Sequence, residues 1–160
     1  MSKNLHIMVG LPGSGKSYWL KENALSEHII SRDEVRFSML SDGDEYFANE
    51  KKVYKEYVRR IQEALDLDED NLHVYADATH INWDSRKKLL NSLRIDSNLK
   101  IHIIYIDATV GKCIFNNKER TDRANVRPRV IKQFAERFTH PAKDSILYDS
   151  ITTVRFPKKR

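Results

Sequence analysis

The chain has 160 residues and a mass of 18.8 kDa, which suits one compact domain, so we treat residues 1–160 as a single domain. Its 32% charged and 40% hydrophobic residues exclude a disordered chain, and no apolar run approaches the roughly 20 residues that span a bilayer. The single cysteine, Cys113, excludes an internal disulfide framework. The single cysteine fits a reducing compartment, and the N-terminus shows no signal-peptide pattern, so we expect a cytoplasmic protein without membrane partners. The net charge of +5 favours polyanionic partners without proving one.

Strands and helices are predicted to alternate along the chain. Short apolar runs indicate strands, and apolar residues spaced by three, four and seven indicate helices, above all a long one at residues 45–67. In chain order we expect a strand at 4–9, a helix at 16–24, a strand at 28–31, helices at 32–40 and 45–67, a strand at 72–78, a helix at 83–93, a strand at 100–108, helices at 110–118 and 128–138, and a strand at 150–156. This alternation predicts an α/β fold with a central, mostly parallel five-stranded sheet flanked by helices.

The segment GLPGSGKS matches the phosphate-binding pattern G-x-x-x-x-G-K-[ST] in full. Its glycines permit positive φ, so the loop can wrap a phosphate with its N–H groups pointing inward, and the following helix adds its N-terminal dipole. Lys16 is expected to reach the β- and γ-phosphates, and the Ser17 hydroxyl to ligate Mg²⁺. The residues expected to bind ATP in this segment are Gly10, Pro12, Gly13, Ser14, Gly15, Lys16 and Ser17. The alternative, a simple glycine-rich turn, is disfavoured by the strand and helix predicted on either side.

A candidate acceptor site follows the second predicted strand. Asp33 and Arg36 are three residues apart, on one face of a helix start, and ligands of open α/β sheets bind at the carboxyl ends of the strands. Asp33 is a candidate general base for an attacking hydroxyl, and Arg36 a candidate clamp for the acceptor. The alternative is an aspartate in a first helical turn with a local ion pair to Arg36. The spacing alone does not choose between them.

Two more candidate residues lie at the end of the third predicted strand and in the turn after it. Asp77 stands at its end, where a carboxylate can orient Mg²⁺ or its waters, although it also suits a cap of the following turn. His80 comes next in a turn, where a histidine is usually a surface residue, and we assign it no catalytic role. The scattered histidines and the single cysteine show no metal-ligand spacing.

A basic stretch at about residues 116–129 lies between two predicted helices. Its arginines are expected to close over ATP as a lid, with Arg120 or Arg123 neutralising charge on the β- and γ-phosphates. The alternative is a solvated basic loop, the usual fate of a charge run.

Taken together, these segments resemble the kinase module of polynucleotide 5′-hydroxyl kinases, including that of bacteriophage polynucleotide kinase–phosphatases. The resemblance spans residues 5–138 and is carried by GLPGSGKSYWL, SRDEVRFSML, YADATHINWDSRKKL and the NNKER…TDR…ANVRPRVI stretch. It implies a P-loop kinase fold with a helical lid, and an ATP- and Mg²⁺-dependent enzyme that phosphorylates the 5′-hydroxyl ends of DNA or RNA, as in nucleic-acid repair.

The resemblance also implies roles for particular residues. Lys16 and Ser17 correspond to the ATP- and Mg²⁺-binding residues, and Asp33 to the general base. Arg36 corresponds to the residue that holds the phosphate 3′ of the acceptor nucleotide. Arg120 matches the catalytic lid arginine best, with Arg123 as the second candidate. The phosphatase motif of bifunctional members is absent from the sequence, so no 3′-phosphatase activity is expected.

Two other functions stay open. One is a small-molecule kinase acting on a nucleoside, sugar or aminoacyl hydroxyl. The other is a nucleotide-dependent ATPase or binding module without an acceptor. The sequence does not distinguish DNA from RNA, or single strands from duplex ends, and it leaves the oligomeric state open.

Overall fold

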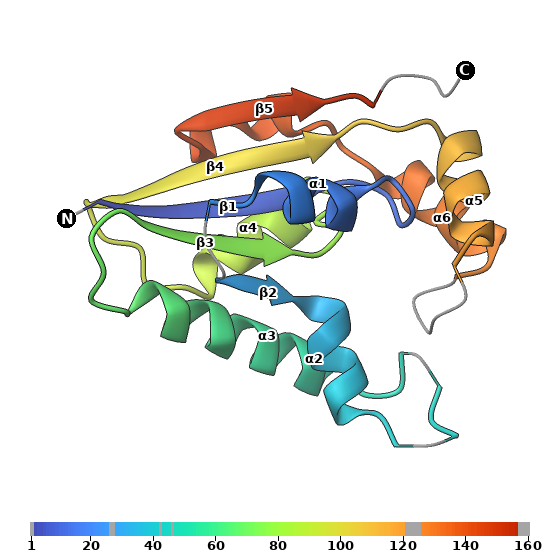
Figure 1. Ribbon diagram of the computed structural model, residues 1–160, viewed down its shortest axis with the longest axis horizontal. Helices are drawn as coiled ribbons and strands as arrows, with labels where there is room; N and C mark the ends of the chain where they lie inside the picture. The colour runs from blue at the N-terminus through green and yellow to red at the C-terminus, as the bar shows by residue number, and fades with distance from the viewer. Residues whose placement is uncertain (1, 26–27, 42, 46, 121–125, 157–160) are drawn as a thin grey trace.

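Five strands form one sheet in the order β2-β3-β1-β4-β5, and every pairing is parallel (Figure 1). The computed structural model describes residues 2–25, 28–41, 43–45, 47–120 and 126–156. The strands are β1 (Lys3–Val9), β2 (Ile29–Ser31), β3 (Leu72–Asp77), β4 (Leu99–Ile106) and β5 (Ser150–Val154). The α/β class with a parallel sheet is therefore confirmed. β3 and β2 lie on one side of β1, and β4 and β5 lie on the other. The loop after β1 therefore lies at the point where the strand order reverses.

Helices cover the two faces of this sheet unequally. They are α1 (Lys16–Asn23), α2 (Arg32–Met39), α3 (Glu50–Leu65), α4 (Trp83–Asn91), α5 (Val110–Lys118), α6 (Pro128–Arg137) and the 3₁₀ helix η1 (Pro141–Leu147). One face packs against α3 and α4 through a large core that includes Leu5, Ile7, Tyr57 and Leu89. On the other face, α1 lies in front of the strands in Figure 1 and buries Leu20 in a smaller apolar cluster. Alternate residues of each strand thus serve two separate cores.

Two stretches differ from the expected elements. The long helix predicted from residue 45 begins only at Glu50, and before it the Ala48 N–H donates to the Glu45 carbonyl over 3.0 Å, a three-residue spacing typical of a turn. The helix η1 was not predicted. Pro141 at its first position has a backbone angle suited to a helix start, and the His140 ring accepts a hydrogen bond from the Ala142 N–H. Short 3₁₀ turns have no long apolar period, so patterning does not detect them.

The expectation that His80 is a surface residue is wrong. Its side chain is buried: Nδ1 donates to the Met8 carbonyl over 2.6 Å, and Nε2 accepts from the Tyr57 hydroxyl over 3.1 Å. The buried Arg86 guanidinium donates to the His80 carbonyl and forms a two-point ion pair with Asp144 of η1, at 2.9 Å for each contact. This network ties the turn after β3 to β1 and to the C-terminal part of the chain.

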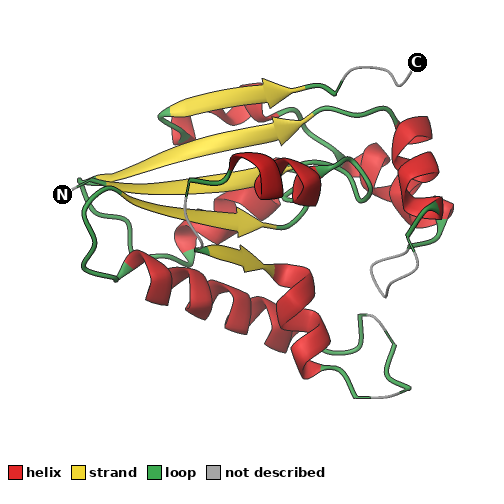
Figure 2. Ribbon diagram, in the orientation of Figure 1, coloured by secondary structure: helices red, strands yellow, loops and turns green. Residues whose placement is uncertain are grey.

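All five strands point the same way, so their carboxyl ends meet along one edge of the sheet (Figure 2). The loop after β1, the start of α2 and the turn after β3 therefore come together at this edge. Within the ranges given above, no helix is both long and apolar enough to cross a membrane.

Candidate functional site

The loop between β1 and α1 forms a tight cradle. Gly13 and Gly15 have φ values of 82° and 107°, conformations that side chains with a Cβ rarely adopt. A Cβ at Gly13 would lie 2.5 Å from the Cys113 carbonyl oxygen, and Asn116 Nδ2 donates to the Gly13 carbonyl over 2.9 Å. Helix α5 thus supports the loop from the side. The local sequence folds this way because glycine alone fits both the angles and the close contact.

Lys16, the first residue of α1, lies over this loop. Its Nζ donates to the Gly10 and Leu11 carbonyls at 3.0 and 2.9 Å, and to Ser14 Oγ at 3.4 Å. Burial lowers the pKa of Lys16 to about 8, and the nearby Asp77 carboxylate opposes that shift. A cation held here by loop oxygens stands where the phosphates of a nucleotide would meet it.

The residues of the loop divide by exposure. Ser17 is exposed in the first turn of α1, and Ser14 is buried. The Ser14 N–H donates to the Leu11 carbonyl over 3.0 Å. A Cβ at Gly10 would lie 2.7 Å from Ser14 Oγ. Gly10 and Ser14 therefore lie inside the turn, while Pro12, Gly13, Gly15, Lys16 and Ser17 line a cavity of about 700 Å³.

Asp77 lines the same cavity from the end of β3. It lies in register with Ser31 of β2, so it stands between the phosphate loop and the start of α2. Burial raises the pKa of Asp77 to about 6, and Lys16 opposes that shift. Asp33 and Glu34 reinforce it by adding negative charge nearby. A carboxylate surrounded by other acids and facing a phosphate site has the chemistry of a Mg²⁺ or Mg²⁺-water ligand.

Asp33 and Arg36 occupy the first turns of α2 and form an ion pair with each other. The helix starts here because the Ser31 hydroxyl accepts a hydrogen bond from the Glu34 N–H. Arg36 is only 5% exposed, whereas the Asp33 side chain is 41% exposed, and both line the cavity that contains Lys16. The local ion pair is therefore present, and both side chains also line the cavity, whereas the roles of Asp33 as general base and Arg36 as acceptor clamp stay predictions.

Glu50 at the start of α3 is a site residue that the sequence did not reveal. Its carboxylate accepts from Arg36 Nε over 2.7 Å and from Arg32 Nη2 over 2.9 Å. Hydrogen bonds and charge from Arg36 and Arg32 outweigh burial and lower the pKa of Glu50. Glu50 also lines the cavity. No signal in the sequence pointed to it, because it lies 14 residues beyond Arg36 and meets it only through the packing of α2 on α3.

The basic stretch contributes Arg120 to the cavity. Its positive charge adds to the downward shift of the Lys16 pKa and opposes the upward shift of the Asp77 pKa. Arg123 lies outside the described residues. The buried Asn117 closes the connection between α5 and α6, because its side-chain amide exchanges hydrogen bonds with the backbone N–H and carbonyl of Val126. This pairing anchors the two helical ends of the stretch that was expected to act as a lid.

The family of the chain follows from comparison with known proteins. A family model described as an AAA domain matches residues 5–141, which include the phosphate loop, α2 and the end of α6. The chain belongs to this AAA domain family. With its phosphate loop after the central strand of a parallel sheet, this AAA domain protein has the P-loop kinase fold that its sequence predicted. No curated protein sequence matches it significantly.

Solved structures share the fold at low sequence identity. A fungal RNA kinase superimposes with a TM-score of 0.70 at 14% identity, covering 100% of this chain and 78% of its own. The Pnkp1/Rnl/Hen1 RNA repair complex contains a chain that matches with a TM-score of 0.66 at 17% identity, covering 89% of this AAA domain protein and 46% of its own length. A gluconokinase from Sinorhizobium meliloti 1021 matches with a TM-score of 0.58 at 16% identity, covering 99% and 84%. At these identities the likeness establishes the fold of the AAA domain protein and leaves the acceptor undetermined.

Proposed function

We propose that this protein is a kinase that transfers the γ-phosphate of ATP to the 5′-hydroxyl end of a polynucleotide, DNA or RNA. One observation carries the proposal: the carboxylate of Asp33 and the guanidinium of Arg36 line the same cavity as Lys16 of the phosphate loop. A hydroxyl acceptor needs a base, and an acceptor nucleotide carries a 3′ phosphate that needs a cation. The resemblance of the R-D-x-x-R segment to polynucleotide kinases supports the same acceptor, and so does the fold shared with a fungal RNA kinase and with a chain of an RNA repair complex.

The residues divide the reaction between them. Asp33 accepts the proton of the acceptor's 5′-hydroxyl while the hydroxyl oxygen forms a bond to the γ-phosphorus. The bond from that phosphorus to the bridging oxygen breaks, and its electron pair leaves on ADP. Lys16 and Arg120 stabilise the negative charge on the phosphates, and Arg36 holds the 3′ phosphate of the acceptor. Arg123 is proposed as the alternative lid residue.

The residues at the phosphate loop fit a Mg²⁺ ion. The exposed hydroxyl of Ser17 and the carboxylate of Asp77 line one cavity, and oxygen donors of this kind, completed by phosphate oxygens and water, are what Mg²⁺ prefers. In the described parts of the chain, no group of three or more histidine, cysteine or acidic side chains is placed to hold a metal ion by itself. Bound beside Ser17 and Asp77, Mg²⁺ would neutralise charge on the β- and γ-phosphates.

The experiment that tests this function is transfer of label from γ-labelled ATP to 5′-hydroxyl oligonucleotides, with DNA and RNA as separate arms. We expect labelled 5′ ends with at least one of the two, and a rate that falls as salt is raised, because the acceptor is a polyanion. Failure to label any oligonucleotide by protein that still binds ATP would overturn the proposal.

A second candidate is a sugar kinase, because the gluconokinase shares the fold over 99% of this chain. The same assay with gluconate and simple sugars as acceptors separates the two functions. Labelled sugar phosphate without labelled oligonucleotide would favour the second candidate.

A further inference from the structure

The part of the cavity formed by α2 and the segment leading to α3 contains two phenyl rings. Phe37 follows Arg36 directly on α2, and Phe47 lies three residues before Glu50. Both line the cavity together with Asp33 and Arg36. Phe47 is 48% exposed, so part of its ring is open to a ligand in the cavity.

Building on the proposed function, we propose that the base of the acceptor nucleotide packs on Phe47, with Phe37 beside it, so that the enzyme selects a nucleotide rather than a sugar as acceptor. The position of Phe47 relative to Arg36 is the first support. The guanidinium carbon of Arg36 lies 5.4 Å from the centre of the Phe47 ring. Glu50 fixes that guanidinium through a 2.7 Å hydrogen bond, so the cation and the ring are held as neighbours.

The covalent geometry of a nucleotide fits this arrangement. The base, the 5′ oxygen and the 3′ phosphate are attached to one sugar ring. When Asp33 takes the 5′ hydroxyl and Arg36 takes the 3′ phosphate, the base has to lie within a sugar's width of both. Arg36 lies over one part of the Phe47 ring, and the half of Phe47 that stays exposed offers an apolar surface on which the flat face of a base can pack.

The chemistry of the two rings favours a base over a polyol. A sugar is recognised by hydrogen bonds to its hydroxyl groups, and phenyl rings supply none. Stacking on an aromatic ring works for any base, because every base has a π-face. We therefore expect acceptors with different 5′ bases to be phosphorylated with similar kcat/KM, and an acceptor without a 5′ base to be phosphorylated with a lower kcat/KM.

The test compares a 5′-hydroxyl oligonucleotide with the same oligonucleotide carrying an abasic residue at its 5′ end. For the wild-type protein, kcat/KM should be about tenfold higher with the base present. Phe47→Ala should lower kcat/KM about tenfold for the normal acceptor and change it less than about twofold for the abasic one, so that the preference disappears. Phe47→Trp should keep the preference, because the indole also stacks.

Phe115→Ala is the matched control. Phe115 is 55% exposed on α5 and is not among the residues that line the cavity, so its loss should leave the preference intact. Equal kcat/KM for the two acceptors with wild-type protein would overturn the inference, and this measurement needs no variant to fold. An equal loss on both acceptors in Phe47→Ala would overturn it as well. If no oligonucleotide is phosphorylated at all, the proposed function fails and the inference with it. If oligonucleotides are phosphorylated with the same kcat/KM whether or not the 5′ base is present, the inference fails and the proposed function stands.

Discussion

At the scale of single residues, the most informative group is Arg36. Two carboxylates share its guanidinium, Asp33 from the same helix and Glu50 from the next. An acceptor phosphate bound by Arg36 would compete with Asp33 for that charge and would release the Asp33 carboxylate to take a hydroxyl proton. Glu50 would stay in place, because it also pairs with Arg32. On this account the resting ion pair and the catalytic role of Asp33 are two states of one site.

The Asp33→Asn variant tests this role. Since an amide cannot accept the proton, we expect kcat for phosphate transfer to fall by a factor of about 10² to 10⁴, while the ATP dissociation constant changes little. Label-transfer kinetics and ATP titration measure the two quantities. Asp84→Asn is the matched control, because Asp84 also stands exposed in a first helical turn, on α4, and does not line the cavity. Near-normal kcat in Asp33→Asn would refute the assignment.

Gly13 gives a second prediction at this scale. Gly13→Ala forces a Cβ to within 2.5 Å of the Cys113 carbonyl at a φ of 82°, so we expect at least tenfold weaker ATP binding and a lower melting temperature. Two other glycines separate the causes. Gly43 has a φ of 87° but open space around it, and Gly111 lies in α5 with nothing within 4 Å. Gly43→Ala should cost some stability without weakening ATP binding, and Gly111→Ala should be neutral or slightly stabilising.

At the scale of elements, the site depends on how α2 packs on α3. The two helices are linked by the Glu50 contacts to Arg32 and Arg36 and by packing of their apolar faces. The phosphate loop is similarly supported by α5 through Asn116. Neither support touches the reacting atoms directly. Each holds a cation or a loop where the chemistry needs it.

The Glu50→Gln variant tests the packing of α2 on α3. The amide cannot hold two guanidinium groups as a carboxylate does, so Arg36 should lose its fixed orientation. We expect the acceptor KM to rise about tenfold with a smaller change in kcat, measured by label transfer over a range of oligonucleotide concentrations. Glu56→Gln is the control from the same helix, because Glu56 pairs with the more exposed Arg59 and Arg60 away from the cavity. A KM unchanged in Glu50→Gln would show that Arg36 needs no such support.

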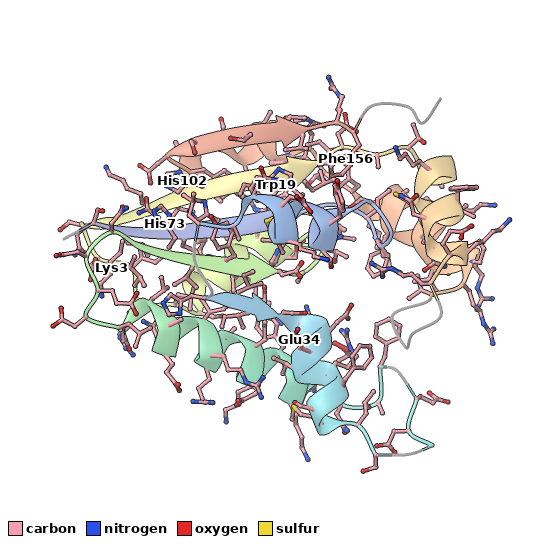
Figure 3. All side chains as sticks on the ribbon, viewed as in Figure 1. Lys3, Trp19, Glu34, His73, His102 and Phe156 are labelled. Atoms are coloured by element: carbon pink, nitrogen blue, oxygen red, sulfur yellow. The ribbon has the colours of Figure 1, made fainter. Side chains whose placement is uncertain are left out.

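At the scale of the whole molecule, the sheet face that carries α1 is unusual for its histidines. His6, His73 and His102 stand on three neighbouring strands, and Figure 3 labels His73 and His102 on this part of the sheet, away from the ends at which the strands stop. The His6 ring stacks on His73, His102 and Tyr75, with centroids 5.1, 4.9 and 4.4 Å away. Burial, with help from its two histidine neighbours, lowers the pKa of His6 to about 4. Burial also lowers the pKa of His80 to about 4 on the opposite side of β1.

These shifts predict how stability depends on pH. Because the folded pKa values of His6 and His80 lie below the ordinary value near 6.5, the unfolded chain binds protons that the folded one does not. The contribution of these two histidines to the free energy of unfolding is therefore fully present above about pH 6.5. It decreases as pH falls towards 4, by up to ~1.4 kcal/mol per pH unit for each histidine. Urea unfolding at pH 7.5, 6.0 and 5.0 measures this. His6→Gln should make the decrease shallower. A flat profile over this range would contradict the prediction.

Local sequence patterns predict the phosphate loop and the order of the strands and helices. The phosphate loop is fixed by short-range chemistry, since only glycine fits Gly13 and Gly15, and the order of strands and helices follows from apolar periodicity. Strands joined by helices pair in parallel, so that order predicted a mostly parallel five-stranded sheet, although not the order of its strands, and it placed Asp33 and Asp77 at the strand ends that also carry the phosphate loop. The sequence therefore determined the fold class and the glycine loop, whose binding of phosphate stays a prediction.

Only the tertiary structure decided what surrounds that site. Glu50 reaches Arg36 because two helices pack, and His80 is buried because α3 brings Tyr57 over the turn after β3. Neither contact leaves a local signal, since each joins residues 14 or more positions apart. The same holds for Phe47, whose place beside Arg36 follows from the path of the chain between α2 and α3. Long-range packing sets such contacts, and no spacing along the sequence encodes them.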